Sequence, residues 1–236
     1  MLGQTPRVLP WEDVCMNDKK NVFLGFLLSI VVAVSWFFIY AFLHEFGHAI
    51  FGWLYGGEVD NFHIVGFDAH ISFVPSSFGP VSLFGQALIH SGGVLFPIVT
   101  GIISLCFYRP GVKSYIYHLY YKVIGIALPT SLFPWVGVPI ISLYRVTSER
   151  EDATWFLRAT ESHFHPLFVT LGTILIILGY TLFAFKKGVY GRRDDTGKMI
   201  WFDSGGTAIH FTDVLIAMST AGAALIFIAI SFALSA

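Results

Sequence analysis

The chain has 236 residues, enough for one ordinary domain and too few for two. Hydrophobic residues make up 55% of it, charged residues only 12%, and the mean hydropathy is +0.70. Soluble proteins carry about 25% charged residues, so this composition predicts an integral membrane protein. The 14 Lys and Arg nearly balance the 15 Asp and Glu, which argues against nucleic acid as a partner, and two cysteines cannot build a cysteine zinc site or a disulfide framework.

We predict an all-α polytopic membrane protein that forms one membrane-embedded domain over residues 1–236, with about five transmembrane helices. A polar N-terminal segment, 1–21, precedes an apolar run from Val22 to about Tyr55. A helix of that length measures about 50 Å against about 30 Å of hydrocarbon, so it must tilt, bend or project beyond the lipid bilayer. Further apolar segments long enough to cross cover about 81–107, 115–144, 167–185 and 211–235.

Three other segments carry patterns of their own. Glu58 to Val74 alternates in part around Gly66-Phe67-Asp68, which predicts a short membrane-associated β-hairpin after the first helix. Prolines and glycines interrupt segment 115–144, which predicts a broken helix that faces the protein interior. The basic loop 186–210 is predicted to be solvated, with room for a small hairpin.

The distribution of Lys and Arg predicts the orientation in the membrane. Ten of them fall in the N-terminus and in the loops 109–114 and 186–210, against three in the loops and tail of the other side. Because cytoplasmic loops are enriched in Lys and Arg, we expect a multi-pass protein with a cytoplasmic N-terminus and an external C-terminus.

The first predicted helix contains His44-Glu45-Phe46-Gly47-His48, an H-E-x-x-H sequence. Four residues make about 400° of helical rotation, so both imidazoles lie on one face within reach of one zinc ion. Glu45 is then next to a ligand, where it can act as the general base on a water molecule. This pattern predicts a zinc hydrolase site with His44 and His48 as ligands.

Three other interpretations fit the same residues. The two histidines can be interior polar groups that bond to each other or to backbone carbonyls, although ionisable groups inside spans usually mark a site. They can also form an ion or proton relay of a transporter together with Glu45. Finally, the chain can be a catalytically inactive membrane scaffold, against which the intact Glu45 argues.

A catalytic zinc ion needs a third protein ligand and an open position for water. Asp152 ranks first, because it begins an amphipathic stretch on the side where the first helix ends, although it also suits a helix N-terminus. One group of alternatives lies in the predicted surface hairpin, which would have to fold back to supply the ligand: Asp60, His63, Asp68 and His70. A second group lies in the basic loop and at the start of the last span, on the opposite side of the membrane: Asp194, Asp195, Asp203 and Asp213.

Three segments resemble the site-2 protease family of intramembrane zinc metallopeptidases, particularly its compact membrane-only branch. His44 to Ala49 is followed by Trp53-Leu54-Tyr55-Gly56-Gly57-Glu58-Val59, and Ser91-Gly92-Gly93 is similar to a small-residue stretch of that family. Glu151-Asp152-Ala153 with Leu157 and Thr160 resembles the segment that supplies its aspartate ligand. The family's Asn…Pro…Leu-Asp-Gly run would fall at 128–137, which keeps the prolines but has neither Asn nor Asp, so no residue is assigned to stabilise an oxyanion.

The residues and the resemblance together predict a zinc endopeptidase that cleaves in or near the spans of membrane-anchored substrate proteins. One Zn²⁺ per chain would be held by His44, His48 and Asp152, with Glu45 as the catalytic base. We expect the hairpin to present a strand edge to substrate, with Ile64 and Ile71 as binding residues. No regulatory module fits in 236 residues, so a regulator would be a separate subunit. His90 is expected either to line the cavity or to form a hydrogen bond between helices.

Overall fold

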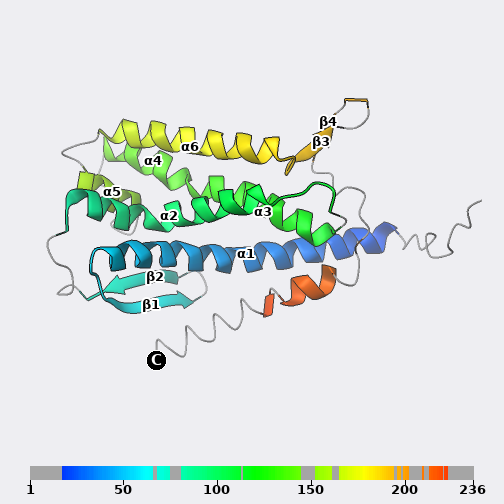
Figure 1. The fold of residues 1–236 in the computed structure, drawn as a ribbon, viewed down its shortest axis with the longest axis horizontal. Helices are drawn as coiled ribbons and strands as arrows, with labels where there is room; N and C mark the ends of the chain where they lie inside the picture. Colours follow the sequence, from blue (N-terminus) through cyan, green and yellow to red (C-terminus); the bar gives the residue numbers. More distant parts are fainter. Residues whose placement is uncertain are drawn as a thin grey trace, which may run out of the picture.

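The computed structural model describes residues 18–65, 68–74, 81–112, 114–144, 152–160, 165–193, 196–197, 199–201, 209, 213–219 and 221–222. This part of the chain is mostly helical and carries two small antiparallel sheets (Figure 1). In chain order the elements are α1 (Asp18–Leu54), β1 (Val59–Val65), β2 (Asp68–Phe73), α2 (Leu83–Cys106), α3 (Tyr115–Ser131), α4 (Phe133–Ser142), α5 (Asp152–Thr160), α6 (Pro166–Lys186), β3 (Gly191–Arg193) and β4 (Met199–Trp201).

Four helical segments in the described part of the chain are long and apolar enough to cross a membrane: Phe23–Leu54, Leu83–Cys106, Tyr115–Ser142 and Pro166–Lys186. They indicate a helical membrane protein and match four of the five predicted spans. The fifth, 211–235, lies mostly outside the described residues, as does most of the polar segment 1–21. Residues 213–219, near its start, are helical.

The predicted break in the third span is confirmed and falls at Leu132, which ends α3 and begins α4. Pro134 occupies the first turn of α4, where a backbone N–H would have no partner within the helix, so proline is tolerated there. The break lets α4 pack on α5 and α6, while α3 packs on α1, α2 and α6. The main core lies between these helices and includes Trp36, Leu105, Leu128, Trp135 and Tyr180.

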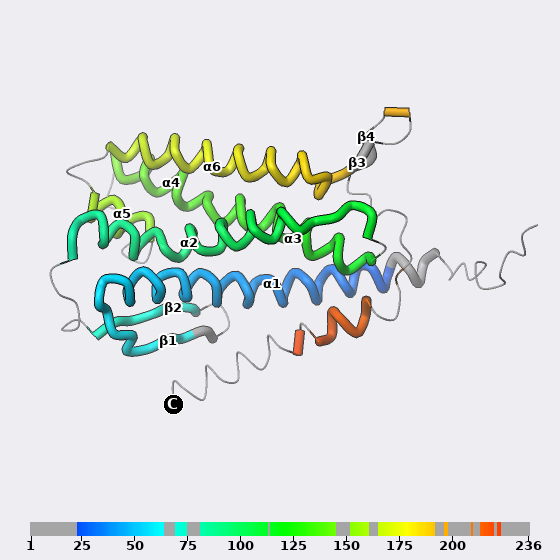
Figure 2. The backbone as a smooth tube through the Cα atoms, in the orientation of Figure 1, coloured from blue at the N-terminus to red at the C-terminus, as the bar shows by residue number. Residues whose placement is uncertain are grey.

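The β1–β2 hairpin lies along the C-terminal half of α1, and α2 lies along the opposite flank of the same helix (Figures 1 and 2). Alternation along the strands directs two aromatic side chains toward α1. Phe62 packs edge-on against Phe42, with ring centroids 5.8 Å apart, and Gly52 leaves room for the ring of Phe73. The hairpin predicted for 58–74 is therefore confirmed, and β3 pairs with β4 in the loop 186–210.

Helices α1 and α2 are in close backbone contact at a point where both carry glycine. A Cβ atom on Gly92 would lie 2.6 Å from the carbonyl oxygen of Gly47, so neither position accepts a larger residue without a shift of backbone. This contact places one face of α1, including His44 and His48, directly against the α2 backbone.

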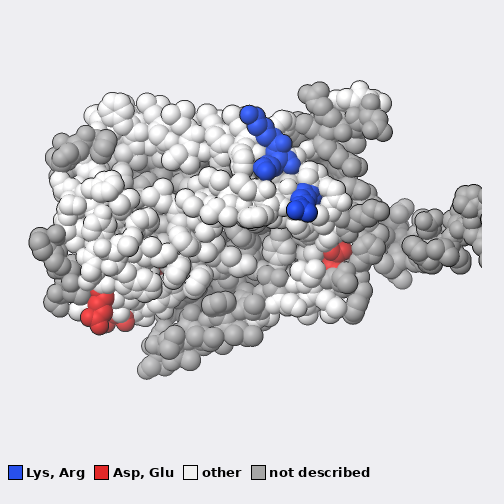
Figure 3. All heavy atoms as spheres, in the orientation of Figure 1, with Lys and Arg blue, Asp and Glu red and all other residues white. Residues whose placement is uncertain are grey.

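The described charges are distributed unevenly along the molecule. On the face drawn in Figure 3, Lys and Arg side chains gather toward the end where α2 and α6 finish, whereas acidic side chains appear at both ends. The C-terminal end of α1, the hairpin, α5 and the start of α2 share the other end (Figure 1).

Candidate metal centre

His44 and His48 lie on one face of α1, one helical turn apart, as their spacing predicts. Their rings meet edge to face with centroids 5.0 Å apart, and their Nε2 atoms are 3.3 Å apart. Glu45 follows His44 on the same turn and is only 5% exposed. Two nitrogen donors and one buried carboxyl group therefore lie together near the end of a long apolar helix.

Asp152 joins this group from the first residue of α5. Its Oδ2 atom lies 2.9 Å from Nε2 of His44 and 3.3 Å from Nε2 of His48. Packing of α5 on α2 brings it there across more than 100 residues of sequence, with Ala153 and Leu157 buried in the contact. Among the described residues, these three side chains form the one cluster of metal-ligating groups, with donor atoms within 4.8 Å of one another.

Contacts outside the cluster orient both imidazoles. Nδ1 of His48 donates to the carbonyl oxygen of Ile89 on α2 at 2.6 Å, which leaves Nε2 of the neutral ring free to offer its electron pair. Nδ1 of His44 lies 3.4 Å from the hydroxyl oxygen of Tyr40, one turn earlier on α1. Histidine ligands of metal sites characteristically use the second ring nitrogen in this way.

The three donor atoms fit a tetrahedral zinc site. Ligands bound at about 2.0–2.2 Å in tetrahedral geometry lie about 3.3 Å from one another, close to the 2.9, 3.3 and 3.3 Å found here. Three electron-pair donors facing one another repel unless a proton or a cation lies between them. Two imidazole nitrogens and one carboxylate oxygen are ligands that zinc accepts, and they leave the fourth position open.

The surroundings of Asp152 favour its ionised form. Burial acts to raise the pKa of its carboxyl group, but hydrogen bonding to His44 and His48, and the charge of these imidazoles when they are protonated, outweigh burial and hold this pKa well below its usual range. The carboxylate is therefore ionised at neutral pH, which is the form that binds a cation.

A glycine on α2 leaves space for the cluster. A Cβ atom on Gly93 would lie 2.6 Å from Nε2 of His44 and would also collide with His48. Only a residue without a side chain lets α2 pass this close to the two donor nitrogens.

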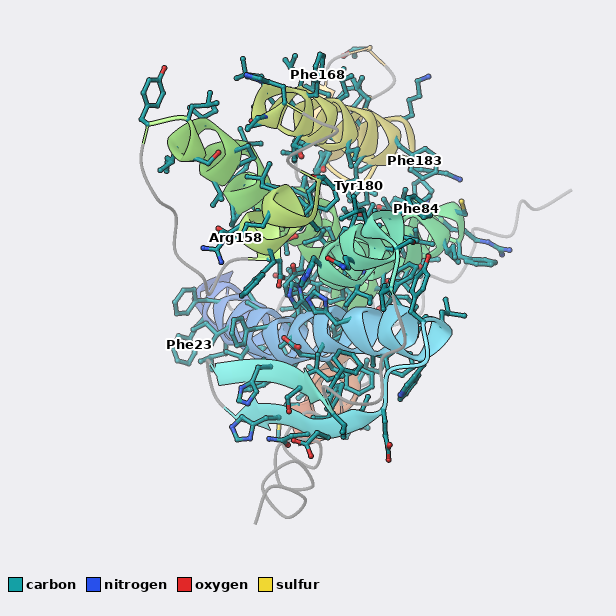
Figure 4. All side chains as sticks on the ribbon, turned by 90° about the vertical axis from the view of Figure 1, so that its left-hand side faces the viewer. Phe23, Phe84, Arg158, Phe168, Tyr180 and Phe183 are labelled. Carbon is teal, nitrogen blue, oxygen red and sulfur yellow. The ribbon has the colours of Figure 1, made fainter. Side chains whose placement is uncertain are left out.

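The cluster opens into a cavity of about 390 Å³ between α1, α2, α5 and β2. In the end-on view of Figure 4, α5 lies between α1 and α4, and Arg158 projects outward from it. The walls of the cavity contain both the cluster and further residues from all four elements. They are His44, Glu45, His48, Ala69, His70, Ile71, Phe73, Ile89, His90, Asp152 and Trp155.

The residues predicted to bind substrate or to line the cavity occupy different positions in the structure. Ile71 lies on the cavity wall, whereas Ile64 belongs to β1, the strand paired with β2, and its side chain lies outside the described residues. His70 reaches the cavity without joining the cluster. His90 is found in the cavity lining, the first of its two predicted locations.

The other alternative ligands are placed elsewhere or are not described. Asp213 accepts hydrogen bonds from Ser114 and Ile116 at the start of α3, at the opposite end of α1. Asp60 and His63 belong to β1 and do not join the cluster. The side chains of Asp68, Asp194, Asp195 and Asp203 lie outside the described residues.

Sequence reasoning did not single out Tyr40, Ile89 or Trp155. Tyr40 precedes His44 by four residues, the same spacing that separates His44 from His48. Residues at this spacing share one face of a helix, so the sequence did contain a signal that Tyr40 lies beside His44. The Ile89 carbonyl and the Trp155 ring carried no such signal, because their roles depend on how α2 and α5 pack.

Comparisons of the chain with models of protein families, with curated proteins and with solved structures found no match.

Proposed function

We propose that the chain is a membrane-embedded zinc endopeptidase that hydrolyses peptide bonds in or near the spans of membrane-anchored proteins. The observation that carries the proposal is the meeting of His44, His48 and Asp152 beside the buried Glu45, in a cavity at the end of an apolar helix. The resemblance of the 44–59 segment to the site-2 protease family favours the same reaction.

The chemistry divides between the ion and the chain. Zinc bound at such a site acts as a Lewis acid and lowers the pKa of water toward about 7. The Ile89 carbonyl accepts from Nδ1 of His48 and so holds its Nε2 as the electron-pair donor, while the Tyr40 hydroxyl contacts Nδ1 of His44. Glu45 accepts a proton from the attacking water as the water oxygen bonds to the carbonyl carbon, and it delivers that proton to the leaving amine as the C–N bond breaks.

The shape of the cavity supports an extended substrate. One wall includes the β2 residues Ala69, His70, Ile71 and Phe73, and in the described part of the chain β1 pairs with one edge of β2. We propose that the opposite edge pairs with the backbone of an extended substrate, because a peptide bond inside a regular helix has its own hydrogen bonds and cannot pair in this way. Ile71 then contacts the substrate directly, while β1 supports the strand from behind.

We place the protein in the membrane as a multi-pass chain with its N-terminus in the cytoplasm. The described Arg109 and Lys187 lie outside the spans and Lys186 ends the last of the four, all at the end where α1 begins, in keeping with the enrichment of cations on the cytoplasmic side. The candidate site lies at the other end of α1. A protease-sensitive tag at the N-terminus should survive digestion of sealed cells and be cut after lysis, and a tag cut in sealed cells would reverse the orientation.

The Glu45→Gln variant tests the reaction. Glutamine keeps the shape and leaves all three ligands in place but cannot accept the proton, so zinc content should stay at the wild-type level while hydrolysis falls by at least about 10²-fold. The measurement is cleavage of a co-reconstituted single-span protein with a Gly-Pro-containing span. A Glu45→Gln protein that cleaves near the wild-type rate would disprove the role of Glu45.

A further inference from the structure

His90 is an imidazole of the cavity that stays outside the metal-ligating cluster. It precedes Gly93 by three residues on α2, and residues at this spacing share one face of a helix. Gly93 lies against the donor nitrogens of His44 and His48. Helical side chains lean toward the N-terminus of their helix, so the ring of His90 is directed away from Gly93 toward the start of α2, and it lines the same cavity as the cluster.

Packing fixes one face of the His90 ring. It stacks on the indole of Trp155 with ring centroids 5.8 Å apart and an interplanar angle of 16°, and the guanidinium of Arg158 lies 5.0 Å from the centre of the same indole. Within the described part of the chain, neither ring nitrogen of His90 has a hydrogen-bond partner. The ring is thus held in place while its nitrogen-bearing edge stays available to a molecule in the cavity.

The backbone beside His90 is tied to the candidate metal centre. The carbonyl oxygen of Ile89, the preceding residue, accepts the hydrogen bond from Nδ1 of His48. A change in the position of this turn of α2 would move a ligand, so the turn that carries His90 has a fixed distance from the cluster.

Hydrolysis of a peptide bond needs a donor besides the metal ligands and Glu45, and among the described residues that line the cavity the side-chain N–H groups outside the cluster belong to His70, His90 and Trp155. Negative charge develops on the carbonyl oxygen as water adds, and a fixed donor aimed at this oxygen lowers the barrier. Glu45 and Asp152 accept hydrogen bonds when ionised, and the segment 128–137 has no Asn. His70 stacks on His63 of β1 with centroids 4.9 Å apart, on the hairpin side of the cavity.

We propose that a ring N–H of neutral His90 donates a hydrogen bond to the carbonyl oxygen of the scissile peptide as that oxygen gains negative charge. His90 transfers no proton and forms no covalent bond, because Glu45 carries the proton from water to the amine. The role rests on the proposed endopeptidase function and assigns the oxyanion donor of that reaction.

The test compares His90→Ala and His90→Gln with His165→Ala, a matched change of an exposed histidine that precedes α6 and does not line the cavity. Each full-length protein is assayed in vesicles on one single-span peptide, and mass spectrometry identifies the bond that is cut. A phosphinic analogue of this peptide, with a tetrahedral group at the cut bond, serves as the binding probe. Zinc content and thermal unfolding of each variant are measured alongside.

We expect His90→Ala to lower kcat by about 10²- to 10³-fold with little change in KM, as removal of one oxyanion donor does. Binding of the phosphinic peptide should weaken by the same factor as kcat/KM, because both report interaction with the tetrahedral state. His90→Gln, which keeps an N–H donor, should recover part of both losses. His165→Ala should leave kcat within about threefold of wild type.

Two results would overturn the role of His90 but not the endopeptidase function. The first is a wild-type protein that cleaves the peptide and a His90→Ala variant with the same kcat. The second is loss of zinc in both His90 variants, which would mean that His90 only holds the metal ligands in position. A wild-type protein that neither cleaves the peptide nor binds its phosphinic analogue would overturn the endopeptidase function, and the role of His90 with it.

Discussion

Asp152 is the residue whose position decides between a metal centre and an ordinary helix start. A carboxylate that only capped α5 would need no imidazole contacts, yet Oδ2 of Asp152 lies 2.9 Å from His44 and 3.3 Å from His48. Both imidazoles are in turn held by partners outside the cluster, at Tyr40 and at the Ile89 carbonyl. Such doubly held ligands are expected of a site whose geometry must be kept before the metal binds.

Replacement of Asp152 by Ala should therefore remove zinc and activity together. We expect zinc per chain to fall by more than about tenfold, because two imidazoles alone hold the ion poorly. Asp68→Ala, in the hairpin, is the control and should keep both near the wild-type level. Metal analysis of the purified proteins decides the point, and a larger zinc loss in Asp68→Ala would transfer the third ligand to the hairpin.

The identities of the ligands could be predicted from single residues, but the contacts around them could not. His44 and His48 follow from helical spacing, and Asp152 ranked first because it shares a side with the end of α1. Gly93 and Trp155 depend on the crossing of α2 with α1 and α5, and nothing in their own sequence neighbourhoods fixes that crossing.

At the scale of elements, the hairpin lies where it would guide substrate in the proposed reaction. Phe62 and Phe73 anchor it on α1, and β2 forms a wall of the cavity. The strand edge therefore has a fixed position relative to the candidate ligands. Strand addition would hold an extended substrate beside Glu45 without any contact to the metal itself.

Proline substitutions in the hairpin separate substrate binding from metal binding. Ile71→Pro and Ile64→Pro each remove a backbone donor, so both should lower cleavage while zinc content holds. We expect the larger loss from Ile71→Pro, because Ile71 lies on the cavity wall and Ile64 belongs to the strand behind it. Cleavage assays beside metal analysis measure this, and full activity in both variants would exclude strand addition but not the metal centre.

Most elements could be predicted because their signals are local. Apolar runs gave four described spans, Pro129 and Pro134 marked the break near Leu132, and alternation gave the hairpin. The start of α1 differs from the prediction of a helix from Val22, because Asp18 to Asn21 are polar but still helical. Which face of α1 packs inward could not be read from its apolar residues, which surround the helix on all sides.

At the scale of the whole molecule, the candidate site lies at one end of a bundle of apolar helices. The C-terminal end of α1, the start of α2, α5 and the hairpin meet there, whereas α2 and α6 end at the opposite, cation-rich end (Figures 1 and 3). A peptidase site in this position reaches the part of a substrate span close to one membrane surface, where water can enter the cavity.

We propose that this chain hydrolyses peptide bonds with the help of zinc held by His44, His48 and Asp152. The most direct measurement is cleavage of a single-span substrate by the purified wild-type protein in vesicles, before and after removal of zinc by a chelator and after its return. We predict cleavage that disappears with the metal and returns with about one zinc per chain. Cleavage that persists in the metal-free protein, or none after zinc has been bound, would contradict the claim.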